Sequence, residues 1–463
     1  MRRCIILLGI VAAGCTELVF AQTQLAISPE LYKQRRLHFI AQMPDSSLAL
    51  FFAAEPKTRI NDTYYPYRQD NALFYLSGCP EPFSVLILFK SPVVVGQQMT
   101  REVLFVQPRD PSEEIWTGRR LGAAGARQTL QVEVTETIDK LEEFLTRFAK
   151  EQRTAFTTVL FPNTHLRNRS AIPTAQLSTE QLFKQAGFIV QSALPILAKM
   201  RVTKSPEEIR LIQKATDITV AAHLQAIMSC EPDMYEYELA AVAEYVFKRM
   251  GCAYTAYPSI VGSGENSVIL HYDAVRKKMR SGELVVMDMA GEYEGYASDV
   301  TRTIPVSGKF SPEQRAIYEL VLKAQEAAIA ECRAGNPFHA PHLKAVEVIA
   351  DGLLKLGIIQ DRRDYRRYFM HGSSHHVGLD VHDPSFGTLG ENQVITVEPG
   401  IYIAEGSLCD RKWWNIGVRI EDVVLITKDG PRVLSAALPK NPDAIETLMQ
   451  QRGLGNLALP TSP

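Results

Sequence analysis

The sequence predicts a mixed α/β (α+β) chain in which a smaller α/β domain precedes a larger one. The chain has 463 residues, more than one domain usually contains. Short β-type runs alternate with helical runs up to about residue 188, and after about residue 195 long helices are mixed with β-hairpins. A hydrophobic share of 46% and a charged share of 22% are ordinary for globular proteins and exclude a disordered or fibrous chain.

Charge and cysteine content exclude further classes of protein. Lys and Arg number 50 against 52 Asp and Glu, so the formal net charge is -2. The chain therefore has no global positive field with which to bind nucleic acid or an anionic membrane. The seven cysteines are scattered without a Cys-x-x-Cys pair, which argues against a disulfide scaffold and against a thiolate zinc site.

The N-terminus has the pattern of a secretory signal peptide. Two arginines precede an apolar run at residues 4–14, which is too short to span a bilayer, and the small-residue end at residues 19–21 predicts cleavage before Gln22. We therefore expect an exported protein, periplasmic or secreted. Two alternatives stay open: lipidation of Cys15 after processing, and a misassigned start or frayed helix. Five cysteines follow residue 21, so at least one is unpaired within the chain.

The first domain carries both β-type and helical segments. Residues 84–89 and 103–107 are short apolar runs that predict strands, and residues 138–150 have the periodicity of an amphipathic helix. We expect these elements to form one small α/β domain.

A helix start marks the entry to the second domain. Ser205 as N-cap, Pro206 at the first helical position and Glu208 at the third predict a helix that runs to about Cys230. No repeat and no low-complexity segment interrupts the rest. The predicted divisions are a signal peptide at 1–21, an N-terminal domain at 22–195, a catalytic domain at 196–448 and a polar tail at 449–463.

Histidines are crowded in one segment of the second domain. Four of the ten lie within twelve residues, as His371, His375, His376 and His382, and Asp383 follows directly. Burying several imidazoles is costly unless they are paired or act as ligands. The cluster indicates a metal or catalytic site, and the alternative is surface or structural histidine.

Two acids lie in otherwise apolar runs around a turn-like segment at residues 292–295. If this segment is the loop of a hairpin, Asp288 and Asp299 are directly opposite. Opposed side chains have Cβ atoms roughly 4.5–5.5 Å apart. Two ionised carboxylates at that distance repel unless a cation lies between them. The alternatives are one protonated acid, or an edge hairpin with both acids solvated.

Two more acids occupy β-type runs further along the chain. Glu398 lies in residues 394–403 and Glu421 in residues 418–426, and Arg419 is expected on the same strand face as Glu421. Taken singly, each Glu has the alternative of being a solvated strand residue, and it is the set that indicates a ligand site. Two Asp, two Glu and one His form an oxygen-rich ligand set that suits two divalent ions such as Mn²⁺. Two such ions activate water and polarise a carbonyl, which is the chemistry of hydrolysis.

At this point the chain resembles the pita-bread metallopeptidases, and within them the aminopeptidase P (Xaa-Pro aminopeptidase) family. The resemblance implies a pita-bread catalytic domain preceded by the N-terminal domain of that family. The motifs that carry it are residues 67–78 and 114–122 in the first domain, then residues 261–266 leading to His271, the two Asp runs, the histidine cluster, residues 397–400 and residues 419–421.

The resemblance also implies a role for each metal ligand. Asp288 chelates one ion, His375 and Glu398 the other, and Asp299 and Glu421 bridge both. The two ions are expected to be Mn²⁺, and a hydroxide that bridges them attacks the peptide carbonyl.

The remaining residues implied by the resemblance handle protons and substrate. Glu398 is the general base, and His271 and His382 stabilise the tetrahedral intermediate and the leaving group. His371 shapes the pocket, and Arg419 orients Glu421 and neighbouring carboxylates.

The implied activity removes the N-terminal residue from peptides with proline in second position. Proline lacks an amide N–H, so most peptidases cannot accommodate it. The alternatives are a prolidase restricted to dipeptides and a metal-free binding module. No nucleic acid and no integral membrane span are expected, and the family implies a homo-oligomer. Ser373, His376 and Met289 depart from the family pattern and concern the shape of the substrate pocket.

Overall fold

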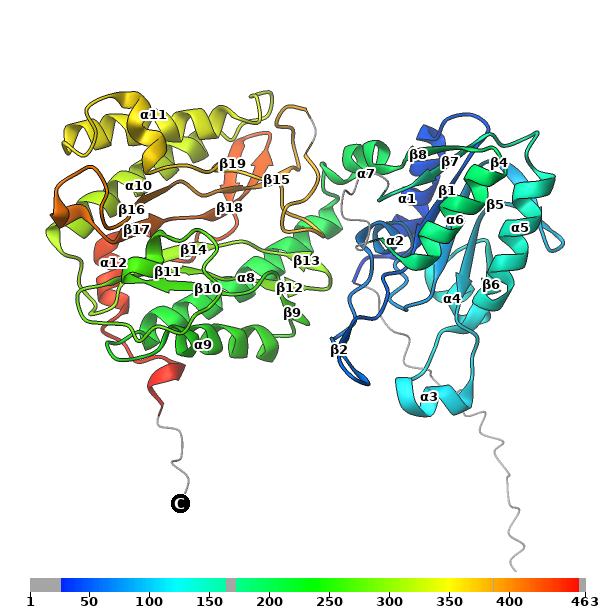
Figure 1. Cartoon of the computed structure of the whole chain (residues 1–463), viewed down its shortest axis with the longest axis horizontal. Helices are drawn as coiled ribbons and strands as arrows, with labels where there is room; N and C mark the ends of the chain where they lie inside the picture. Colours follow the sequence, from blue (N-terminus) through cyan, green and yellow to red (C-terminus); the bar gives the residue numbers. More distant parts are fainter. Residues whose placement is uncertain (1–25, 164–171, 386, 458–463) are drawn as a thin grey trace, which may run out of the picture.

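A computed structural model describes residues 26–163, 172–385 and 387–457. The predicted signal peptide at 1–21 and the alternative lipidation at Cys15 lie outside these described residues. The chain forms two lobes, with α1 to α6 in the right-hand lobe of Figure 1 and α8 to α12 in the left-hand lobe. Mixed helix and sheet in two successive parts confirms the predicted fold class.

The N-terminal lobe is built on a mixed six-stranded sheet of order β6-β5-β4-β1-β7-β8. Its central strand β1 is buried on both faces, because Leu48, Leu50 and Phe52 join one apolar cluster while Ala49 and Phe51 join another. The expected strands at 84–89 and 103–107 are parts of β4 and β5, and the expected helix at 138–150 is α5 with a 3₁₀ turn before it.

The elements of this lobe follow in chain order. The helices are α1 (Pro29–Gln42), α2 (Asn71–Ser77), α3 (Pro111–Thr117), α4 (Gly122–Leu130), α5 (Leu141–Glu151) and α6 (Thr174–Gln185). The strands are β1 (Ser47–Phe52), β2 (Thr58–Ile60), β3 (Thr63–Tyr64), β4 (Val85–Val95), β5 (Gln98–Val106), β6 (Val134–Thr137), β7 (Thr158–Phe161) and β8 (Ile189–Ser192).

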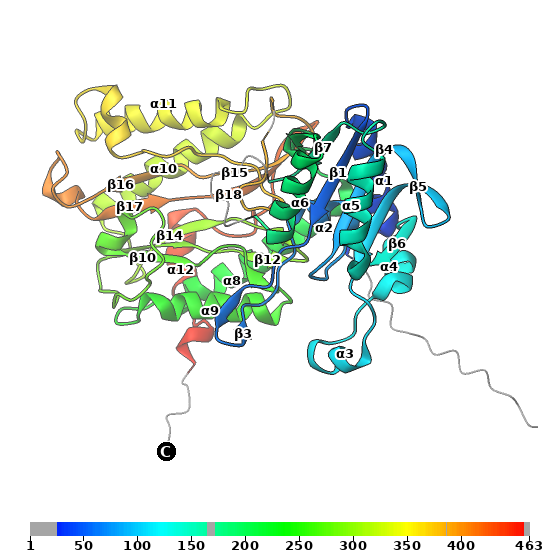
Figure 2. The ribbon, with the colours of Figure 1, turned by 45° about the vertical axis from the view of Figure 1, so that its right-hand side comes forward.

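In the second lobe, small antiparallel sheets lie between the helix pair α8 and α9 and the helix pair α10 and α11, in both views (Figures 1 and 2). Helix α7 (Leu194–Arg201) lies against α1 of the first lobe and leads into the second (Figure 1). The helices of the second lobe are α8 (Pro206–Ser229), α9 (Glu236–Arg249), α10 (Pro312–Ala330), α11 (Ala340–Lys355) and α12 (Pro442–Leu448). The strands are β9 (Tyr254–Thr255), β10 (Ile260–Ser263), β11 (Leu284–Asp288), β12 (Gly291–Tyr293), β13 (Tyr296–Ala297), β14 (Thr301–Pro305), β15 (Val394–Val397), β16 (Gly400–Ile403), β17 (Ile416–Arg419), β18 (Asp422–Thr427) and β19 (Gly430–Val433).

Helix α8 begins and ends where the sequence predicts. The Ser205 hydroxyl accepts a 3.2 Å bond from the Glu208 amide, and the Glu208 carboxylate accepts a 2.9 Å bond from the Ser205 amide. This reciprocal capping satisfies two amides that the helix itself leaves free. The predicted domain limits at residues 195 and 448 stay predictions.

The predicted register of the acid hairpin is wrong by two residues. Asp288 pairs with Thr301 rather than with Asp299. The reason is a two-residue turn at Glu294 and Gly295, with φ angles of 51° and 82°, where the sequence suggested a four-residue loop. Because side chains alternate with a period of two, this shift keeps both acids on the same face.

The predicted continuous strands around the two Glu residues are also interrupted. Strand β15 ends at Val397 and β16 begins at Gly400, so Glu398 lies in the break. Pro399 has no amide N–H and cannot continue the ladder. Likewise β17 ends at Arg419, and Glu421 lies in the gap before β18 begins at Asp422. The expectation that Arg419 and Glu421 leave one face of a continuous strand is therefore wrong.

Candidate metal centre

Two acids, Asp288 at the end of β11 and Asp299 just before β14, lie against a single tyrosine. The Tyr257 hydroxyl is 2.5 Å from Asp288 Oδ1 and 2.6 Å from Asp299 Oδ1. A hydroxyl carries one proton and cannot donate to both carboxylates at once. Two ionised acids at these distances therefore repel each other, and a nearby positive charge offsets that repulsion.

The remaining predicted ligands converge on the same point from the strand breaks. His375 Nε2 lies 3.4 Å from Asp299 Oδ2 and 3.7 Å from Glu398 Oε1. One ligand atom each from Asp299, His375 and Glu421 lies within 4.8 Å of the others. Thr301 donates a 2.7 Å hydrogen bond to Glu421 Oε2. The structure thus brings Asp299, His375 and Glu421 within reach of one ion, with Glu398 beside His375 and with Asp288 joined to Asp299 through Tyr257.

Electrostatics favour a cation in this cluster. Burial and then the negative charges of Asp299 and Asp288, against His375 and Arg419, raise the pKa of Glu398 to about 8. Burial and the neighbouring acids raise the pKa of Glu421 well above its ordinary value. These buried carboxylates have raised pKa values and lie close to one imidazole. Carboxylate oxygens together with an imidazole nitrogen are donors that divalent oxygen-binding metals accept. The residues present therefore fit a divalent metal centre.

Arg419 is the fixed cation beside the cluster. Its guanidinium donates a 2.7 Å hydrogen bond to Asp288 Oδ2 and a 3.0 Å hydrogen bond to the Tyr402 hydroxyl, and its Nε donates to Thr301 Oγ1 at 3.2 Å. Arg419 and Glu421 therefore meet at one threonine, although no continuous strand carries both. The arginine neutralises part of the acid charge and fixes two groups that face the centre.

Three of the predicted histidines surround the cluster. His371 Nε2 is 2.9 Å from the Tyr402 hydroxyl, and its Nδ1 is 3.8 Å from Glu398 Oε2. The exposed His382 lies with its ring centroid 4.2 Å from that of His375. His271 is exposed in the loop after β10. Burial lowers the pKa of His382, and the charge of His271 is among the groups that lower it further.

His376, the fourth histidine of the segment 371–382, has a structural environment. His376 is 1% exposed and stacks on Phe338 with ring centroids 5.1 Å apart. Ser373, which replaces an aliphatic residue of the family pattern, lies 3.2 Å from Nδ1 of His342 on α11. Both departures therefore act on packing beside the centre, and neither side chain joins the ligand cluster.

Three residues at the centre were missed by the sequence reasoning. Thr301 follows Asp299 by two positions, so strand alternation was a usable signal for its facing the same side. Tyr402 lies within β16, where strand alternation was likewise a usable signal for the side that it faces. Tyr257 lies between β9 and β10, and its segment carries no pattern that predicts contact with Asp288.

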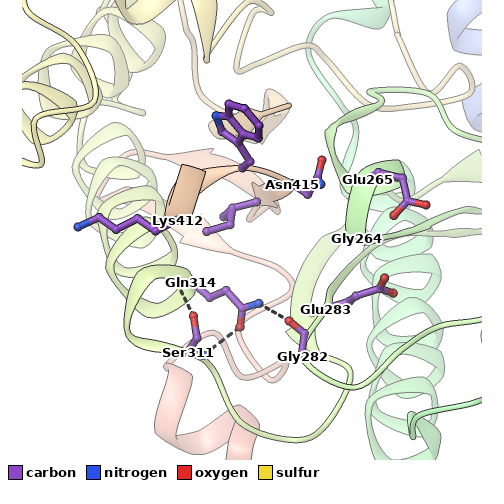
Figure 3. A pocket seen from close by; sticks show the side chains of 10 residues that line it. Gly264, Glu265, Gly282, Glu283, Ser311, Gln314, Lys412 and Asn415 are labelled. Carbon is purple, nitrogen blue, oxygen red and sulfur yellow. Dashed lines mark hydrogen bonds between the residues drawn. The ribbon is translucent and has the colours of Figure 1, made fainter. Parts of the chain in front are cut away.

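The pocket in Figure 3 lies apart from the metal centre. It has a volume of about 330 Å³ and is lined by Glu265 and Glu283, by Gln314 near the start of α10, and by Lys412 and Asn415. None of the predicted site residues lines it. His371 instead lines a second pocket of about 360 Å³, together with aromatic side chains that include Tyr365 and Phe369.

Comparison with known proteins identifies families for both lobes. Residues 210–428 match metallopeptidase family M24, and residues 32–157 match the N-terminal domain of aminopeptidase P. All five predicted ligands lie within the first of these matches.

Individual relatives match along nearly the whole chain. The Xaa-Pro aminopeptidases of Haemophilus influenzae and Escherichia coli are 38% and 37% identical to it, each over 91% of this chain and over 97% and 98% of their own lengths. Solved structures of proline aminopeptidase P II from Yersinia pestis and of E. coli aminopeptidase P with the inhibitor Pro-Leu each superpose with a TM-score of 0.83 at 37% identity. Each covers 92% of this chain, and the matches span 100% and 98% of those chains. The chain therefore belongs to metallopeptidase family M24, as a member that carries the aminopeptidase P N-terminal domain.

Proposed function

We propose that the chain is a metal-dependent Xaa-Pro aminopeptidase, which removes the N-terminal residue from peptides with proline in second position. The observation that carries this proposal is the convergence of Asp288, Asp299, His375, Glu398 and Glu421 on one cluster, in a chain related along its length to Xaa-Pro aminopeptidases.

We further propose that the centre takes two ions, with manganese as the preferred metal. Asp288 would hold one ion and His375 with Glu398 the other, while Asp299 and Glu421 would contact both. Four carboxylates and one imidazole, with no thiolate, support a hard or borderline cation. Bound ions of this kind lower the pKa of water and polarise the scissile carbonyl.

The protein's own groups supply proton transfer and substrate positioning. Glu398 is the proposed proton acceptor, since its carboxylate faces both His371 and His375 within 4 Å. His382, exposed beside His375, and the exposed His271 would donate hydrogen bonds to the developing oxyanion and the leaving nitrogen. Tyr402 accepts a hydrogen bond from Arg419 and contacts His371, and these two side chains would form a wall for the proline ring.

A peptide panel tests this function. Purified protein loaded with Mn²⁺, Co²⁺ or Zn²⁺ is incubated with Xaa-Pro-Yaa, Xaa-Pro and Xaa-Ala-Yaa peptides, and released amino acids are identified by mass spectrometry. We expect release of Xaa from Xaa-Pro-Yaa alone or preferentially, and loss of that release after chelation. Cleavage confined to Xaa-Pro dipeptides would indicate a prolidase, and hydrolysis insensitive to chelation would refute the metal mechanism.

We also propose that the protein is exported. Support comes from the basic start, the short apolar run and the small residues before Gln22. Within the described part of the chain, no helix is long and apolar enough to cross a membrane. Mass analysis of the mature protein from a cell fraction tests this: an N-terminus at Gln22 indicates a cleaved signal, and a lipidated Cys15 indicates an anchored protein.

We propose that the protein self-associates through its N-terminal lobe. Ile115 and Trp116 on the short helix α3 are 81% and 85% exposed, and α3 projects from this lobe in both views (Figures 1 and 2). Such exposure of a large apolar pair is typical of a contact surface. Light scattering of the protein and of the double variant Ile115→Ser, Trp116→Ser tests this, with a lower mass expected for the variant.

A further inference from the structure

The loop that carries His382 is held in part from outside the catalytic lobe, by residues of the N-terminal lobe. We propose that Arg68 and Asn71, both in the N-terminal lobe, are positioning residues that hold His382 in its working place across the domain boundary. The inference deepens the proposed function and rests on it for the role of His382.

Arg68 makes the broadest set of contacts in this arrangement. Its Nε donates a 2.6 Å hydrogen bond to Glu292 Oε2, and one terminal nitrogen donates to the carbonyl oxygens of Leu379 at 2.7 Å and Gly295 at 3.3 Å. The other terminal nitrogen donates to Asn71 Oδ1 at 2.7 Å. One guanidinium therefore joins the N-terminal lobe to the turn of the acid hairpin and to the start of the His382 loop.

Asn71 continues the same connection toward the histidine. Its amide nitrogen donates to Asp380 Oδ1 at 2.6 Å. The other oxygen of Asp380 accepts a 2.8 Å bond from Arg201, which also bonds Asp383 at 2.5 Å, and Lys204 bonds Asp383 at 2.9 Å. The acids two residues before and one residue after His382 are thus each held by charged or amide donors.

The start of the loop is also bonded to its own lobe: the Val377 amide donates to the Val394 carbonyl at 3.1 Å, and the Gly378 carbonyl accepts from the Ala297 amide at 2.8 Å. Neither of these contacts reaches residues 379–383. Residues 377–382 lie outside any helix or strand, and the exposed His382 has no hydrogen bond of its own among those the structure shows in its described part. Within the loop, the Asp380 amide donates to Asp383 Oδ1 at 3.2 Å and the Asp383 amide donates to the carbonyl of His376 at 2.8 Å. The position of the His382 ring therefore depends on how the flanking acids are fixed.

These contacts do more than join two domains. The lobes also meet elsewhere, where the Ser28 amide and hydroxyl bond the carboxylate of Glu207 at 2.7 and 2.9 Å. That contact touches no residue of the 379–383 loop. By contrast, Arg68 donates to Leu379 and Asn71 donates to Asp380. A displacement of about 1 Å in a catalytic group costs up to about 100-fold in rate. Arg68 and Asn71 are therefore expected to affect turnover through His382.

Hydrogen exchange of the full chain tests the positioning directly, without any need for activity. In Arg68→Ala and in Asn71→Ala, backbone amides of residues 377–384 should exchange faster than in the unmodified protein, while those of β11 should not change. Glu207→Ala, which removes a contact between the same two lobes, should leave residues 377–384 unchanged. Wild-type exchange of this segment in both variants would overturn the inference.

Kinetics on an Xaa-Pro-Yaa tripeptide test the consequence for the reaction. Arg68→Ala should lower kcat about 10- to 100-fold with unchanged metal content. In a His382→Ala background the same change should have little further effect, because the residue it positions is gone. An equal fall in both backgrounds would overturn the inference. If the unmodified protein cleaves no Xaa-Pro peptide, the proposed function fails, and the exchange experiment still decides whether the loop is held by Arg68 and Asn71.

Discussion

Thr301 donates a hydrogen bond of 2.7 Å to Glu421, across 120 positions of the chain. The same hydroxyl accepts a 3.2 Å bond from Nε of Arg419. Thr301 is fully buried in β14, so it leaves little freedom to the Glu421 carboxylate that it contacts. A non-ligating residue therefore fixes the orientation of a proposed metal ligand.

Replacing Thr301 should weaken metal binding. The change Thr301→Val keeps the shape of the side chain and removes the hydroxyl, which leaves Glu421 and Arg419 without a shared partner. Loss of an outer hydrogen bond of this kind typically costs about 10- to 100-fold in metal affinity. Calorimetric titration of the metal-free protein with Mn²⁺ measures the change.

Thr427→Val is the matched control for this prediction. Thr427 ends β18, the strand that follows Glu421. Its hydroxyl donates to the carbonyl of Gly430 and accepts from the amide of Asp429, both in the neighbouring turn and neither at the metal centre. The Mn²⁺ affinity of the Thr427→Val variant should equal that of the unmodified protein. An unchanged affinity in Thr301→Val would show that the hydrogen bond does not order Glu421.

The metal-free protein should lose stability as the pH rises from about 5 to about 9. Glu398, with a pKa of about 8 in the fold and roughly 4.3 when unfolded, binds more protons folded than unfolded between those values. Although burial works against it, the hydrogen bond and charge of Asp299 raise the pKa of His375 to about 9, so its contribution is also lost as the pH rises. Thermal unfolding of chelated protein across this range measures the trend.

Adding manganese should remove most of this pH dependence. A cation bound among the carboxylates favours their ionised form, so the folded state no longer takes up protons there. Saturation at about 100 times the dissociation constant also adds about 2.7 kcal/mol of stability. A metal-free protein with a flat profile over the same range would contradict the electrostatic description of the centre.

Asp383→Asn should destabilise the protein at neutral pH. Burial alone would raise the pKa of Asp383, but Lys204 and Arg201 outweigh it and hold the pKa below its usual value. Its stabilisation is therefore present above roughly pH 4, the unfolded pKa, and is lost as the pH falls through the folded pKa. Breaking a buried ion pair costs about 3–5 kcal/mol. Denaturant unfolding should show a gap at pH 7 that narrows in acid, and a constant gap would refute this account.

The sequence was sufficient for the parts of the fold that depend on local pattern. The capping residues Ser205 and Glu208 placed the start of α8, and alternation placed the acid runs on strands. The predicted register of the hairpin was wrong by two positions. The turn type depends on a positive φ at Glu294, which the residue type alone does not predict. The period of two made that error harmless for the facing of Asp288 and Asp299.

What the sequence could not supply is contact between distant segments. Tyr257 reaches Asp288 and Asp299 from a loop with no periodic signal, and Arg68 reaches Leu379 across 311 positions. Such partners are set by how the lobes and sheets pack, which no local propensity encodes. The resemblance to a known family supplied the ligand roles, and those assignments stay predictions.

The scattering of the ligands also sets the order of events during biosynthesis. Glu421 follows Asp288 by 133 positions in the chain, so Asp288 is made much earlier. A nascent polypeptide can therefore complete the proposed ligand set only after Glu421 has been synthesised. The compartment in which the finished protein folds, and the ions available there, then decide which metal the enzyme acquires.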